Sequence, residues 1–104
     1  MTWATKLHRL SKDFAIEAER ASRDGAEKES KDFFGKAAEL ETQALISLPA
    51  TKPRTRGVIA VHAVWLWTRA GEYCVAIQLI DEYILDATIS KVAKDKLERW
   101  KNVL

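Results

Sequence analysis

The middle of the chain, from Thr42 to Gly71, contains basic residues but no aspartate or glutamate. The basic residues are Lys52, Arg54, Arg56 and Arg69. Arginine binds carboxylates and phosphates through paired N–H donors, and the free N–H groups at a helix start attract the same anions. This pattern predicts an anion site at Arg54 and Arg56, at the start of a helix. Two other interpretations stay open: a buried helix excludes acids, and the arginines could pair with acids of the second helix or cover apolar surface.

His62 lies inside the long apolar run from Val58 to Trp67. There it could line a groove or act as an acid or base. The only other histidine is His8, and no cysteine or carboxylate stands at metal-ligand spacing from His62. We therefore expect His62 to be a core or groove-edge residue, with no metal and no cofactor. The chain also has no phosphate-binding glycine loop, no Gly-x-Ser-x-Gly motif and no zinc signature, so we expect no catalytic residues and no enzyme activity.

Trp65, Trp67 and Tyr73 form a candidate aromatic binding surface, because aromatic side chains supply much of the energy of protein interfaces. On a helix, residues 65 and 67 point about 200° apart, so they cannot face the same way. We expect one tryptophan in the core and the other exposed or reaching another helix.

The composition limits the class of protein. With 104 residues the chain makes one domain with a modest core, and its four glycines and two prolines are too few for the turns of an all-β domain. The 17 lysines and arginines balance the 15 acidic residues too closely for net charge alone to predict nucleic-acid or membrane binding. The longest apolar run is shorter than the roughly 20 residues of a membrane-spanning helix, and the N-terminus lacks the apolar core of a signal peptide. We expect a cytoplasmic protein with one free cysteine and no membrane contact.

Apolar residues recur every three or four positions almost throughout, which predicts an all-α fold. The expected helices span residues 3–23, 26–48, 55–70, 72–86 and 89–103. Residues 1–104 then form a single domain, with a first hairpin over 3–48, a linker over 49–53, a second hairpin over 54–86 and a closing helix over 89–103. The third helix is apolar nearly all round, which predicts that it lies at the centre.

The glycines are expected to have separate roles. Gly25 and Gly71 should form the turns of the two hairpins. Gly57 falls in the first turn of the third helix, where a ligand could approach the backbone. Gly35, inside the second helix, is expected to mark close helix packing.

An internal repeat supports the hairpin arrangement, with Gly25 aligned on Gly71. The two copies read Phe14-x3-Ala18-x2-Ala21-x3-Gly25-x4-Ser30-x3-Phe34-x2-Ala37 and Ala60-x3-Val64-x2-Trp67-x3-Gly71-x4-Ala76-x3-Ile80-x2-Tyr83. The turn Ala70-Gly71-Glu72-Tyr73-Cys74-Val75-Ala76 resembles the Gly-x-Tyr-x-x-Ala turn of tetratricopeptide repeats, although the repeat is about 12 residues longer than the usual period of 34. The stretch from Lys52 to Val64 also looks like small uncharacterised bacterial proteins of this type. The resemblance covers residues 14–83 and implies a tetratricopeptide-like (TPR-like) fold that binds a protein or peptide on a concave face.

These observations predict a non-catalytic adaptor that binds a partner protein or peptide, or a second copy of itself, in a groove between its hairpins. The candidate contact residues are Arg54, Arg56, His62, Trp65, Trp67, Arg69 and Tyr73. The alternative is a small accessory subunit that binds nucleic acid through phosphate contacts. Its contact residues would be Lys6, Arg9, Lys12, Lys52, Arg54 and Arg56.

Overall fold

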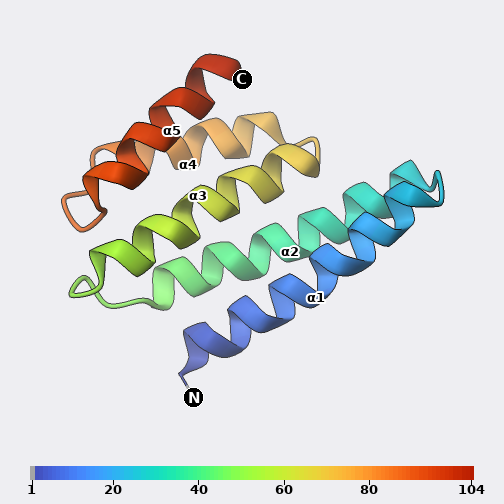
Figure 1. Ribbon diagram of the computed structural model, residues 1–104, viewed down its shortest axis with the longest axis horizontal. Coiled ribbons are helices and arrows are strands. Elements are labelled where there is room, and N and C mark those ends of the chain that lie inside the picture. Colours follow the sequence, from blue (N-terminus) through green and yellow to red (C-terminus); the bar gives the residue numbers. More distant parts are fainter. Residues whose placement is uncertain (1) are drawn as a thin grey trace.

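The computed structural model describes residues 2–104, and these residues form five α-helices and no strand (Figure 1). The helices are α1 (Trp3–Arg23), α2 (Glu27–Ser47), α3 (Pro53–Arg69), α4 (Tyr73–Ile84) and α5 (Lys91–Val103). The all-α, five-helix prediction is therefore confirmed. In the part of the chain that the structure describes, no helix is both long and apolar enough to cross a membrane.

Local sequence signals explain where the helices begin and end. The Thr2 hydroxyl accepts a hydrogen bond from the Thr5 amide at 3.1 Å and caps α1. Gly25 and Gly71 have φ angles of 78° and 80°, the left-handed region that favours glycine at a helix end. Pro53 stands at the first position of α3, two residues before the predicted start, because proline needs no hydrogen-bond partner there. Ser90 caps α5, so this helix begins two residues later than predicted.

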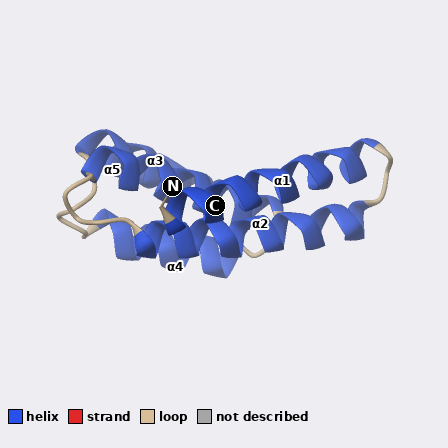
Figure 2. Ribbon diagram, turned by 90° about the horizontal axis from the view of Figure 1, so that it is seen from below, coloured by secondary structure: helices blue, strands red, loops and turns tan. Residues whose placement is uncertain are grey.

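The helices form a flat slab that is two layers deep, with extents of 40 × 36 × 17 Å. Figure 2 shows α1, α3 and α5 on one side of the slab and α2 and α4 on the other. α3 packs against α2, α4 and α5, which agrees with the central position expected of an apolar helix. One buried cluster surrounds Leu45, Val64, Ile80 and Leu97, and a second joins α1, α2 and α3 around Ala18, Phe34 and Leu66.

Two glycines show how helix packing differs from the sequence prediction. A Cβ atom on Gly57 would lie 2.6 Å from the Ala93 Cβ and 2.9 Å from the Ser90 hydroxyl, so this glycine lets α5 cross close to α3. The group that approaches the Gly57 backbone is thus α5 of the same chain, where the sequence had suggested a ligand. A Cβ on Gly35 would meet nothing within 4 Å, so the prediction of close packing at Gly35 is wrong.

Candidate functional site

Arg56, a predicted anion ligand, is buried and bonded within the fold. Its Nη1 donates to the carbonyl oxygens of Leu45 at 2.9 Å and Leu48 at 2.7 Å, which are at the C-terminal end of α2. Its Nε donates to the Thr88 hydroxyl at 3.0 Å, and its Nη2 lies 3.5 Å from a carboxylate oxygen of Asp86. Hydrogen bonds from Thr88, together with the Arg56 charge, lower the pKa of Asp86. Arg56 therefore joins the end of α2 to the loop between α4 and α5.

Arg69 and Arg54 take no part in the contacts of Arg56. Arg69, at the opposite end of α3, stands 13 residues and about 20 Å of helix from Arg56. Its guanidinium carbon lies 4.5 Å from the centre of the Phe34 ring, and its Nη1 donates to Glu19 at 3.3 Å. Arg54 is exposed. The anion site predicted from Arg54 and Arg56 is therefore wrong for Arg56. The alternative of pairing with acids of α2 is also wrong, because Arg56 contacts Asp86 after α4 and Arg69 contacts Glu19 of α1. The covering of apolar surface describes Arg69, which lies over Phe34.

The aromatic residues are also divided between different surroundings. Both tryptophans of α3 are half-buried, so neither lies in the core as expected, and both reach another helix, α2. Trp67 donates its ring N–H to the Thr42 hydroxyl at 3.0 Å, whereas Trp65 meets Phe34 edge-on at 5.9 Å and stacks on His62 at 5.8 Å. Tyr73 is exposed at the start of α4. These three residues do not form one binding surface.

His62 belongs to a three-residue cluster with His8 and Glu41 that the sequence analysis missed. The Glu41 side chain is fully buried, while the side chains of His8 and His62 are 44% and 36% exposed. His8 Nδ1 lies 2.8 Å and 3.0 Å from the two carboxylate oxygens of Glu41, and His62 Nδ1 is hydrogen-bonded to one of them. Because a carboxylate only accepts hydrogen bonds, each Nδ1 is the donor. Helices α1, α2 and α3 thus each place one residue in the cluster.

Spacing along the chain did not reveal this cluster, because its members stand 33 and 21 residues apart. The reason given for expecting no metal site therefore fails, since the ligand-type atoms come together through tertiary packing. One signal was present in the sequence. Glu41 lies on the buried stripe of α2, one turn from both Ala37 and Leu45, where an acid needs a polar partner.

A groove of about 590 Å³ lies between α3 and the start of α5. It is lined by Pro53, Arg54, Gly57, Val58, Val61, Ser90, Val92, Ala93 and Lys96, and none of these residues is acidic. Val58 and Val92 leave 65% and 67% of their surface exposed beside it. The groove thus combines exposed apolar side chains with two cations, Arg54 and Lys96. Among the predicted contact residues, Arg54 alone lines it.

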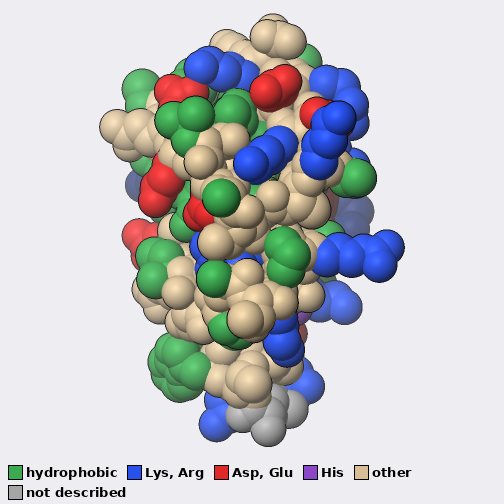
Figure 3. All heavy atoms as spheres, turned by 90° about the vertical axis from the view of Figure 1, so that its left-hand side faces the viewer, with side chains coloured by type: hydrophobic (Ala, Val, Ile, Leu, Met, Phe, Trp, Pro, Cys, Tyr) green, Lys and Arg blue, Asp and Glu red, His purple; other side chains and the backbone are tan. Residues whose placement is uncertain are grey.

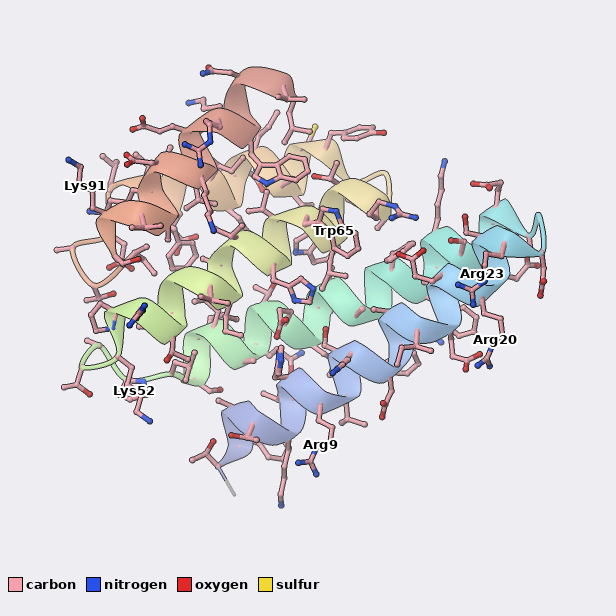
Figure 4. The ribbon with its side chains drawn as sticks, viewed as in Figure 1. Arg9, Arg20, Arg23, Lys52, Trp65 and Lys91 are labelled. Atoms are coloured by element: carbon pink, nitrogen blue, oxygen red, sulfur yellow. The ribbon has the colours of Figure 1, made fainter. Side chains whose placement is uncertain are left out.

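Further basic side chains surround this end of the molecule. Figure 3 looks onto the end where α3 and α5 begin, and most lysine and arginine side chains in view gather on the side that carries α1, α3 and α5. Figure 4 places Lys52 just before α3 and Lys91 at the start of α5, at the same end of the slab. Arg9, Arg20 and Arg23 follow α1, at the far edge from α5.

Comparisons with protein-family models, with curated proteins and with solved structures found no match to this chain.

Proposed function

We propose that the chain is a non-catalytic, TPR-like interaction module that binds an acidic segment of a partner protein in the groove between α3 and α5. The observation that carries the proposal is the lining of this groove, where exposed valines lie beside Arg54 and Lys96 without any carboxylate. An aliphatic side chain of the partner would pack on Val58 and Val92. Carboxylates flanking it would meet the two cations.

The arrangement of the helices supports the TPR-like part of the proposal. The aligned glycines Gly25 and Gly71 adopt the same left-handed conformation, each between two helices of a hairpin. The groove lies between α3 and α5, two helices of the same layer (Figure 2). In helical-repeat proteins, equivalent helices of successive repeats line the binding surface. We also propose a cytoplasmic location, because the only cysteine, Cys74, is a free and exposed thiol.

The basic surface keeps nucleic acid as the alternative class of partner. Two observations favour a protein segment over it. Arg56, one of the predicted phosphate contacts, is bonded within the fold. The groove also exposes apolar side chains, which phosphate contacts do not use.

Synthetic ligands of defined chemistry test the proposal. Fluorescently labelled peptides with one leucine or isoleucine flanked by acidic residues are compared with neutral and basic versions, and with single-stranded RNA and DNA, by fluorescence anisotropy. We expect the acidic peptides alone to bind at physiological salt. Light scattering on the same samples shows whether a second copy of the chain occupies the groove instead.

Matched variants locate the binding. Val58→Asp and Val92→Asp place a carboxylate in the groove and should weaken acidic peptides at least about tenfold, which is roughly 1.4 kcal/mol. Ile46→Asp is the control, because Ile46 on α2 is 69% exposed and lies outside the groove. Equal affinity of the Val58→Asp and Ile46→Asp proteins would reject the groove. Tight oligonucleotide binding that falls steeply with salt, without peptide binding, would favour the alternative.

A further inference from the structure

We propose that His8, Glu41 and His62 form a binding site for a zinc-class divalent metal ion. The proposal is independent of the groove, which these residues do not line. It rests on the convergence of two imidazoles and a carboxylate, whose ligand atoms all lie within 4.8 Å of one another. Among the described residues, no other group of three ligand-type side chains comes together in this way.

The buried Glu41 carboxylate needs a positively charged partner, which the surrounding side chains supply only in part. Glu41 is fully buried, and the described ion pairs give it no lysine or arginine partner, only His8 and His62. Buried carboxylates in proteins are paired with cations or coordinate metals. A divalent ion between the three side chains would supply the missing charge and would replace the two Nδ1–H donors. Each ring would then carry its proton on Nε2.

The distances suit a metal ion after small side-chain rotations. Zinc binds imidazole nitrogen and carboxylate oxygen at about 2.0–2.2 Å, so two ligand atoms at the tetrahedral angle are about 3.4 Å apart. The His8 Nδ1 atom already lies 2.8–3.0 Å from the two Glu41 oxygens. Two of the three helices that carry the ligands, α1 and α2, are tied together close by, since the buried Ser11 hydroxyl, one turn after His8, donates to the Ala37 carbonyl at 2.7 Å. Such a rigid framework limits the cost of ordering the site.

An ion can reach the site and keep one open coordination position. A cavity of about 300 Å³ is lined by His8 and His62 together with Lys12, Ala15, Ile16 and Glu19. The charges of Lys12 and Glu19 offset each other at this opening. Two histidines and one carboxylate with an open position match a common zinc ligand set, and imidazole selects zinc, copper or nickel over magnesium and calcium.

The composition of the chain makes the test unambiguous. It has two histidines, and both belong to the cluster; its single cysteine, Cys74, is exposed on α4. His8→Gln and His62→Gln remove one imidazole each while keeping an amide donor for Glu41, which preserves the buried hydrogen bond. Cys74→Ser is the matched control, because it removes the only thiol. Circular dichroism confirms that each variant folds.

Zinc chloride is titrated into each protein by isothermal calorimetry, with magnesium chloride as the negative control, and Co²⁺ absorption reports the coordination. We expect one zinc ion per chain in the wild type and in Cys74→Ser, and at least about a hundredfold weaker binding in each glutamine variant. We also expect zinc to raise the melting temperature of the wild type but not that of either glutamine variant. The absence of stoichiometric zinc binding at micromolar concentrations, or unchanged affinity in either glutamine variant, would overturn the proposal.

Discussion

Replacing Arg56 by methionine tests whether this arginine stabilises the fold or is available to bind a ligand. Methionine fills a similar space but leaves the Leu48 carbonyl without its donor, and leaves the Leu45 carbonyl with only the Leu48 amide at 3.2 Å. Each unsatisfied buried polar group costs roughly 1–3 kcal/mol, and removing one partner of a buried charge pair costs about 3–5 kcal/mol. The Asp86 contact is partly solvated, because 25% of the Asp86 side chain is exposed. We therefore expect a loss of about 3–5 kcal/mol, a large share of the roughly 5–15 kcal/mol that stabilise a small domain.

Urea unfolding followed by circular dichroism measures this loss. With a slope of about 2 kcal/mol/M, the midpoint should fall by roughly 2 M. Arg56→Lys should recover only part of the loss, because a single ammonium group cannot reproduce the fork of donors. Arg54→Met is the control, since Arg54 is exposed two residues away, and it should change stability by no more than about 0.5 kcal/mol. A loss below about 1 kcal/mol for Arg56→Met, or an equal loss for Arg54→Met, would refute the structural role of Arg56.

The packing around the glycines and the environment of Asp86 give further expectations. Gly57→Ala should lower the free energy of unfolding by about 1–3 kcal/mol, because its Cβ would collide with Ala93. Gly35→Ala should raise the free energy of unfolding by about 0.5–1 kcal/mol, because the new Cβ meets nothing and alanine favours the helix. Urea unfolding of both variants checks the packing. A change of the same sign in the two variants would contradict it. The lowered pKa of Asp86 means that its carboxylate stabilises the fold above pH about 4, and that this stability is lost as the pH falls through the folded-state pKa. Asp86→Asn should therefore be less stable than the wild type at pH 7, and the difference should shrink as the pH falls below about 4 and the Asp86 carboxylate is protonated; a difference that stays constant in acid would contradict it.

The fold was largely predictable because its signals are local. The apolar period sets the five helices, and Gly25 and Gly71 mark turns whose positive φ glycine adopts more easily than any other residue. No helix boundary differs from its prediction by more than two residues; the two helix starts that differ by two are set by Pro53 and Ser90, and α4 ends two residues early, at Ile84.

The functional features were less predictable than the fold, because they depend on contacts between residues far apart in the sequence. The anion prediction treated Arg56 as free, but the C-terminal carbonyls of α2 need donors, and tertiary packing brings Arg56 to them. The cluster of His8, Glu41 and His62 depends in the same way on how three helices pack. The groove between α3 and α5 also depends on tertiary packing, since residues of both helices line it, with Gly57 close to Ala93.

The location of a bound acidic peptide tests the proposed function most directly. In ¹H–¹⁵N correlation spectra of the labelled protein, the account predicts that the peptide shifts amide signals of residues 54–61 in α3 and 91–96 in α5. Signals of α1 should stay unchanged, although α1 carries Arg9, Arg20 and Arg23 along its outer edge (Figure 4). Shifts that cluster on α1 instead, or a spectrum that no acidic peptide alters, would contradict the account.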